Sequence, residues 1–121
     1  MRTLTVTINS DWKTVLREAG AKAQAGLASG TYQGETLNFA TPGQLFSSLS
    51  EKRWNLIDVL LHSGPIGVRE LSRRVQRDVK RVHEDAAALV ELGLIEKDAK
   101  GALSCPFDEI HIDMRATRHA A

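Results

Sequence analysis

The chain has 121 residues, of which 42% are hydrophobic and 26% charged, with a formal net charge of +1. This composition is typical of one globular domain and excludes an intrinsically disordered chain. The single cysteine, Cys105, excludes an internal disulfide framework, and no apolar run is long enough for a signal peptide or a membrane span. We therefore expect a cytoplasmic protein without membrane contact.

The first forty residues alternate in a way that predicts two strands, over 3–8 and over 36–39. Between them, a helix is expected from a cap at Ser10 or Asp11 to about Ala28. Its apolar stripe consists of Trp12, Val15, Leu16, Ala19 and Ala23.

Four further helices are predicted in the middle of the chain. Thr41 can cap the first of them, with Pro42 at the first helical position and Gln44 three residues after the cap. The other three helices cover 50–62, 68–75 and 78–92, the last of them capped by Asp78. The apolar positions expected to face the core are Leu45, Phe46, Leu49, Trp54, Ile57, Leu60, Leu61, Val68, Leu71, Val75, Val79, Val82, Ala86, Leu89 and Val90.

A hairpin is expected after the last helix. The first strand begins at Leu94, residues 98–101 turn, 102–104 return, and Pro106 ends the second strand. Residues 109–115 alternate again and predict another strand, and 116–121 look frayed. The strands over 3–8, 36–39 and 109–115 could pair with each other or with those of a second subunit.

Three helices followed by a hairpin is the order of a winged helix-turn-helix domain. We therefore predict an α+β, mainly helical fold in which a three-helix core carries a β-hairpin wing, with an N-terminal strand–helix–strand extension. The expected division is 1–40 as a dimerisation or partner-binding extension, 41–106 as the DNA-binding domain, and 107–121 as a C-terminal strand and tail.

Positive charge is concentrated at one place in the sequence. Residues 69–81 contain six arginines or lysines against two carboxylates, whereas the remainder of the chain has a small negative excess. Such a concentration is typical of a protein that binds a polyanion, although a charge run is more often a solvated helical face. Its position, on the second helix of the predicted domain and at the start of the third, favours DNA.

Residues on the last two predicted helices, on the turn between them and on the hairpin can be given expected contacts with DNA. The start of a recognition helix reaches base edges in the major groove, which assigns base contacts to Lys80, Arg81, His83 and Glu84. The backbone contacts are assigned to Arg69, Arg73, Arg74 and Arg77, and the wing contacts to Lys97 and Lys100.

The sequence also resembles two known groups of proteins. Residues 50–104 resemble the MarR-like winged helix-turn-helix regulators. The wider pattern KRWNLIDVLL, VRELSRRVQRDVKRVHEDAAALVELGLIE and PFDEIHIDM is similar to short bacterial and archaeal predicted DNA-binding proteins, often antitoxins of the TumA type. Unlike the general helix-turn-helix pattern, the turn at Gln76-Arg77 contains no glycine. The resemblance implies a repressor that controls its own promoter and binds a cognate toxin.

Other classes of function have less support in the sequence. A metal sensor could use His62, His83, Cys105, Asp108, Glu109, His111 or His119, but none shows the spacing of paired metal ligands, so we expect no metal and no cofactor. No motif for catalysis is present, so we expect no enzyme. The alternatives are a stand-alone MarR-like regulator and a winged-helix adaptor that binds protein without DNA, which would not need the basic stretch. A homodimer is expected because one such domain covers about half of a two-fold DNA site, with residues 1–40 supplying much of the contact.

Overall fold

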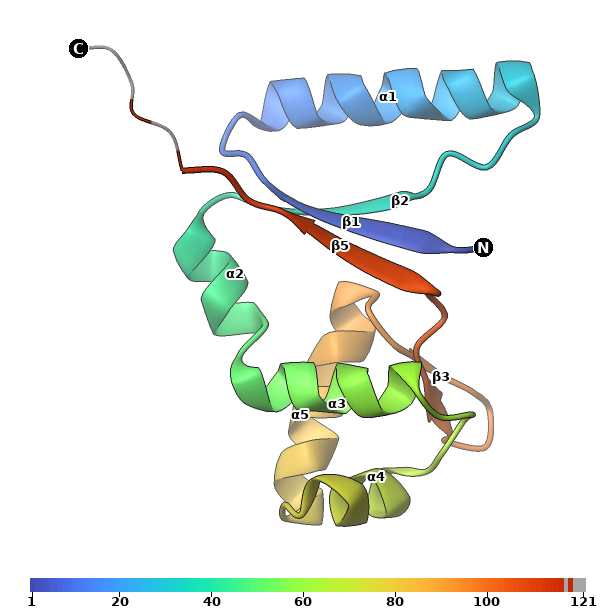
Figure 1. Cartoon of the computed structure of the whole chain (residues 1–121), viewed down its shortest axis with the longest axis vertical. Helices are drawn as coiled ribbons and strands as arrows, with labels where there is room; N and C mark the ends of the chain where they lie inside the picture. The colour runs from blue at the N-terminus through green and yellow to red at the C-terminus, as the bar shows by residue number, and fades with distance from the viewer. Residues whose placement is uncertain (117, 119–121) are drawn as a thin grey trace. The chain divides into compact units, whose positions relative to one another are not determined.

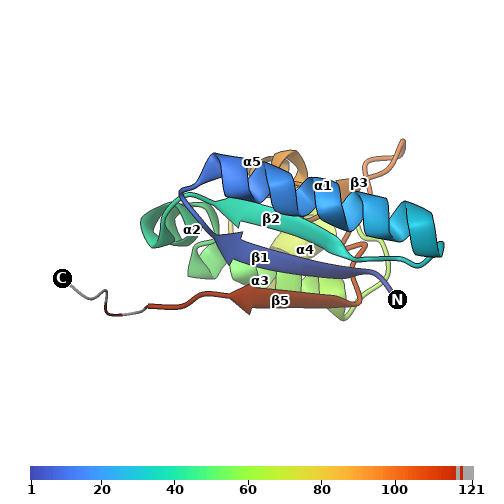
Figure 2. The ribbon, with the colours of Figure 1, turned by 90° about the horizontal axis from the view of Figure 1, so that it is seen from above.

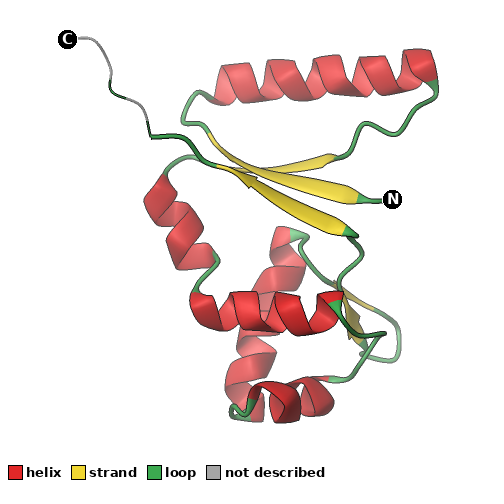
Figure 3. Ribbon diagram, viewed as in Figure 1, coloured by secondary structure: helices red, strands yellow, loops and turns green. Residues whose placement is uncertain are grey.

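The computed structural model describes residues 1–116 and 118, except for the side chain of Trp12. Within this part, the chain is an α+β protein, about half helical, with five helices and two small sheets (Figures 1 and 3). It divides into two compact units. The helical unit comprises Ser48–Asp108, and the sheet unit comprises Arg2–Ser47 together with the segment from Glu109 onward. The C-terminal strand therefore belongs to the same unit as the N-terminal extension.

The sheet unit is built on three parallel strands. β1 (Thr3–Ile8) lies in the centre, with β2 (Glu35–Phe39) on one side and β5 (Glu109–Asp113) on the other. The sequence left open whether these strands pair with each other or with strands of a second subunit. In the structure the three strands pair with each other within one chain. Their alternation separates the side chains by face, because successive residues of a strand point to opposite sides. One face is apolar and carries Leu4, Val6, Ile8, Leu37, Phe39, Ile110 and Ile112; the other, the threonine face, carries Thr3, Thr5, Thr7, Thr36, Asn38, His111 and Asp113.

Helix α1 (Trp12–Ser29) connects β1 to β2 and lies on the threonine face, over the β2 side of the sheet (Figure 2). The Asp11 side chain caps it by accepting hydrogen bonds from the backbone N–H groups of Lys13 and Thr14, as one of the two expected caps. Lys22 Nζ donates to Thr36 Oγ1 at 3.3 Å. Most of the expected stripe stays outside the core: Leu16 is 62% exposed, and Ala19 and Ala23 are exposed as well.

Helix α2 (Pro42–Ser48) starts at the predicted capping residues. Thr41 Oγ1 accepts from the Gln44 backbone N–H at 3.1 Å, and Gln44 Oε1 accepts from the Ala40 backbone N–H at 3.1 Å. The arrangement resembles a capping box, in which the glutamine side chain accepts from the backbone N–H of the cap residue. Here the glutamine accepts from the residue before the cap, Ala40. Leu45 is buried, but Phe46 is exposed, so its assignment to the core was wrong.

Three helices and a hairpin form the helical unit (Figure 1). They are α3 (Glu51–Leu61), α4 (Val68–Val75), α5 (Val79–Leu92), and the strands β3 (Glu96–Lys97) and β4 (Leu103–Ser104). Ser50 stands at the start of α3 as predicted, but its side chain forms no capping hydrogen bond. Ile66, between α3 and α4, exchanges backbone hydrogen bonds of 2.7 and 3.0 Å with Leu103, which attaches the hairpin to the helices.

The core of the helical unit differs from the prediction at three positions on its helices, Leu61, Val79 and Leu56. Leu61 and Val79 were assigned to the core, but both are exposed, because each lies at a helix end where the periodic face turns toward solvent. Leu56, which the periodicity did not select, is fully buried. Leu94 and Ile95 are buried, and the strand that was expected to begin at Leu94 starts only at Glu96. The buried side chains of this unit are Leu49, Leu56, Ile57, Leu60, Leu71, Ser72, Val82, Ala86, Leu89, Leu94, Ile95, Leu103 and Phe107.

The turn between α4 and α5 is made by Gln76 in a left-handed conformation, with φ 56° and ψ 48°. Among the described residues other than glycine, Gln76 has the only positive φ. Ser72 and Arg77 are joined by two hydrogen bonds across the turn: the Arg77 backbone N–H donates to Ser72 O at 3.1 Å, and Ser72 Oγ donates to Arg77 O. The hydroxyl group of the buried Ser72 thus has a hydrogen-bond partner. The left-handed conformation of Gln76, which a glycine would adopt without strain, costs about 1 kcal/mol.

No helix in the part of the chain described here combines the length and the apolar character needed to cross a membrane.

Replacing Gln76 by glycine should remove this backbone cost. We expect Gln76→Gly to raise the free energy of unfolding by about 0.5–1 kcal/mol, measured by urea denaturation. Gly93, at the end of α5 with φ 82°, provides the opposite control, because Gly93→Ala should lower the free energy of unfolding by about 1 kcal/mol. A loss of stability in Gln76→Gly would show that the glutamine side chain holds the turn instead.

Candidate functional site

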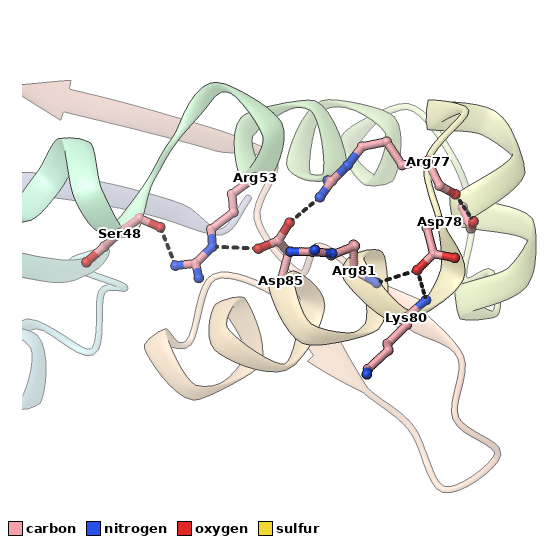
Figure 4. Close-up of polar contacts among 8 residues, drawn as sticks. Ser48, Arg53, Arg77, Asp78, Lys80, Arg81 and Asp85 are labelled. Carbon is pink, nitrogen blue, oxygen red and sulfur yellow. Dashed lines mark hydrogen bonds and ion pairs between the residues drawn. The ribbon is translucent and has the colours of Figure 1, made fainter.

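The first two turns of α5 present the side chains that the sequence assigned to base contacts. Asp78 caps the helix by accepting from the backbone N–H groups of Lys80 and Arg81 at 3.1 and 3.3 Å (Figure 4). With the helix fixed in this way, all four assigned residues are exposed: Lys80, Arg81, His83 and Glu84. Cations in the first turn oppose the helix dipole by about 0.3–1 kcal/mol each, so helix stability does not account for Lys80 and Arg81.

Helix α4 carries three of the four arginines that were expected to contact backbone phosphates, and all three are exposed. Glu70 is the acidic residue among them: it accepts from Arg73 Nη2 at 2.7 Å and from Arg74 Nε at 3.1 Å. These are exposed pairs within one helix, worth only about 0.3–0.5 kcal/mol, and a phosphate can replace them easily. Arg69 is exposed on the same helix.

The hairpin adjoins α5. Asp98 shapes its turn by accepting from the backbone N–H groups of Lys100 and Ala102, both at 2.9 Å, and Gly101 has φ 88°. Lys97 and Lys100 are both exposed. A cavity of about 190 Å³ lies between α5 and the hairpin, and it was not predicted from the sequence; it is lined by Val68, His83, Ala86, Ala87, Val90, Lys97, Gly101 and Leu103. His83 of α5 and Lys97 of the hairpin thus lie along the same hollow.

Arg77 has a different environment from the other arginines. Its side chain is only 19% exposed and turns inward, where Nη2 donates to Asp85 Oδ2 at 2.6 Å (Figure 4). Arg53 of α3 donates from Nε to Asp85 Oδ1 at 3.1 Å, and its Nη1 donates to Ser48 O at 2.9 Å. Arg77, which the sequence grouped with the phosphate contacts, therefore forms part of an internal ion-pair cluster with Arg53 and Asp85.

Asp85 is negatively charged at neutral pH, and this cluster lowers the pKa of its carboxyl group further. Burial raises the pKa of its carboxyl group, but the hydrogen bonds from Arg77 and Arg53 outweigh burial, and the pKa lies below its ordinary value. Nη1 of Arg77 is buried and has no hydrogen-bond partner among the described residues, so the guanidinium depends on Asp85 for its compensation.

Arg53 and Asp85 were not selected from the sequence. They are 32 residues apart, and neither belongs to a motif. The one available signal is that Asp85 stands a turn after Arg81 on a helix whose first turn is basic. The residues that were weighed as possible metal ligands are not grouped either: in the described part of the chain, no three His, Cys, Asp or Glu side chains are placed to hold an ion, and His119 lies outside that part.

Removing the charge of Asp85 should destabilise the helical unit. We expect Asp85→Asn to lower the free energy of unfolding by about 2 kcal/mol at pH 7, because Arg53 and Arg77 lose their counter-charge. Since the folded pKa of Asp85 is below the unfolded value, its contribution is complete above the unfolded pKa of about 3.9 and is lost as the pH falls through the folded pKa. The difference between wild type and variant, measured by urea denaturation at several pH values, should therefore shrink in acid.

The exposed Asp58 of α3 is the matched control. Asp58→Asn should change the free energy of unfolding by less than about 0.5 kcal/mol. An equal effect of the two substitutions would contradict the role given to Asp85.

Comparison with known proteins gives one match. The model of the HVO_A0114 family matches residues 48–112, which cover all of the helical unit and most of β5. No curated protein and no solved structure matches the chain. Because the match extends over more than half of its length, the chain belongs to the HVO_A0114 family.

Proposed function

We propose that α3, α4, α5 and the β3–β4 hairpin form a winged helix-turn-helix domain that binds double-stranded DNA, and that the protein is a sequence-specific transcriptional repressor. The observation that carries this proposal is the exposed cationic surface on α4, the first turn of α5 and the hairpin. Lys80 and Arg81 are the strongest part of it, because they remain exposed at a helix terminus where cations are electrostatically unfavourable. DNA phosphates would compensate that cost.

In this proposal, α5 is the recognition helix. Arg81 and Lys80 can donate to guanine O6 and N7, and Glu84 can accept from cytosine N4. His83 lies farther along the same helix, beside the hollow that adjoins the hairpin, so base and wing contacts would be continuous. Backbone contacts fall to the exposed Arg69, Arg73 and Arg74 and to the hairpin residues Lys97 and Lys100. Arg77 is given a structural role, because its guanidinium is committed to Asp85.

The finer proposal concerns which DNA is bound. The resemblance to TumA-type antitoxins suggests that the protein represses the promoter of its own operon and forms a complex with a toxin encoded beside it. A gel shift with the DNA upstream of its own operon tests the first part, with a shuffled duplex of equal length as the competitor. Binding of both duplexes with equal affinity would leave a non-specific DNA-binding protein, and binding of neither would favour the protein-interaction adaptor.

Two substitutions should separate base readout from phosphate contact. Arg81→Ala is expected to reduce the preference for the specific duplex by about 1–3 kcal/mol. Arg74→Ala should instead weaken binding to all duplexes alike and lower the slope of log affinity against log salt by about one. Fluorescence anisotropy over a series of salt concentrations measures both quantities. If both variants behaved like Arg74→Ala, the assignment of readout to Arg81 would be incorrect.

Two controls accompany this comparison. Arg17→Ala removes the same charge from an exposed position on α1 in the sheet unit, and it should leave DNA affinity unchanged. Thermal denaturation should show that Arg81→Ala is at least as stable as wild type, because the substitution removes a cation from the first turn of α5. A loss of affinity in that variant can then be attributed to the contact rather than to unfolding.

A further inference from the structure

Strand β5 is an edge of the three-stranded sheet, and its outer side is exposed. The strand order is β2-β1-β5, and within the described residues no other strand pairs with the outer side of β5 (Figure 2). Its apolar side chains are only partly covered: Ile112 is 41% exposed and Met114 47%. The alternating pattern of the sequence continues to Arg115, two residues beyond the last residue paired with β1, Asp113. An open edge with exposed apolar residues is a ready site for addition of another strand.

The backbone of β5 defines which groups point outward. The Glu109 N–H donates to Arg2 O, on the β1 side. Because alternate residues of a strand direct their hydrogen-bonding groups to opposite neighbours, His111 and Asp113 also face β1. The N–H and C=O groups of Ile110 and Ile112 therefore point away from the sheet, and those of Met114 follow the same alternation.

The side chains of this segment are self-complementary about Ile112. In an antiparallel pairing of two copies with Ile112 opposite Ile112, Ile110 lies opposite Met114, His111 opposite Asp113, and Glu109 opposite Arg115. Each position that carries a carboxylate thus faces a basic side chain, and each apolar position faces an apolar one. The opposing residues at 110, 112 and 114 are those whose backbone groups point outward, so they would exchange the N–H···O bonds of an antiparallel ladder.

We propose that two copies of the chain associate through β5, antiparallel about Ile112, to form a continuous sheet in the order β2-β1-β5-β5-β1-β2. This two-fold contact closes on itself, as expected for a homodimer. The apolar faces of the two sheets lie on the same side, so Ile110, Ile112 and Met114 gain apolar neighbours across the axis. The contact lies in the sheet unit and does not depend on DNA binding by the helical unit.

The charges select this register. Moving the pairing by two residues in one direction places Glu109 opposite Asp113, and moving it by two in the other places Asp113 opposite itself. A shift by one residue would oppose outward backbone groups to groups already bonded to β1. The other edge, β2 (Glu35–Phe39), contains one charged residue and has no comparable self-complementarity.

Charge reversal provides a test with an internal rescue, using the full-length protein without DNA. Wild type should run in light scattering after size exclusion at twice the 13.3 kDa of the chain. Glu109→Arg places two arginine pairs across the axis, and Arg115→Glu places two glutamate pairs there. Each variant should weaken the dimer by about tenfold or more, and circular dichroism should confirm that each stays folded.

Mixing the two variants should restore the dimer. In a one-to-one mixture, the arginine introduced by Glu109→Arg faces the glutamate introduced by Arg115→Glu. The native Arg115 of the first variant likewise faces the native Glu109 of the second. A heterodimer should therefore form with an affinity close to that of wild type, and the double variant, Glu109→Arg with Arg115→Glu, should form a homodimer.

Three outcomes would overturn the proposal. The first is a monomeric wild type. The second is a dimer insensitive to both reversals, as a contact through α1 would give. The third is a mixture that stays monomeric while its components are folded. None of these outcomes bears on the gel shift, so the two proposals can fail separately.

Discussion

Asp85 receives hydrogen bonds from two arginines that come from different parts of the helical unit, and the arrangement of its helices depends on this carboxylate. Arg53 belongs to α3, and Arg77 lies at the end of the α4–α5 turn, so the two ion pairs with Asp85 connect these segments to α5. The position of that turn determines where α5 begins, and the start of α5 is where Lys80 and Arg81 are exposed. A cluster that is mostly shielded from water thus fixes the orientation of the proposed DNA-reading surface. Such clusters add little net stability compared with apolar packing, but their partners cannot be removed one at a time without a large cost.

Much of the fold could be predicted because the signals are local. The caps at Asp11, Thr41 and Asp78, and the helical periodicity between them, predicted where helices start. Three of the errors have a common physical cause: Phe46, Leu61 and Val79 are apolar residues at or near helix ends, where neighbouring packing rather than periodicity decides burial. The pairing of β5 with β1 was left open, because alternation shows that a strand has two faces but does not identify its neighbours.

The candidate site shows the same division. Exposure of Lys80, Arg81 and Arg74 follows from their phase on amphipathic helices, which is readable from sequence. The inward orientation of Arg77 cannot be predicted from the sequence. Its guanidinium contacts an aspartate eight residues later, and a third residue, from another helix, completes the cluster. A count of charges along the sequence therefore groups Arg77 with the solvent-facing arginines. In the folded protein its side chain is instead largely shielded from water and paired with Asp85. The cavity beside His83 arises from alanines and a glycine that carry no signal by themselves.

The central position of β1 has a consequence for how the protein is made. Its two neighbours come from opposite parts of the chain: β2 follows within about thirty residues, whereas β5 lies more than one hundred residues away. During synthesis, β1, α1 and β2 leave the ribosome before the helical unit, and β5 leaves after it. For that interval, β1 has an open edge in place of β5. The nascent sheet is therefore open to wrong strand partners until β5 has left the ribosome.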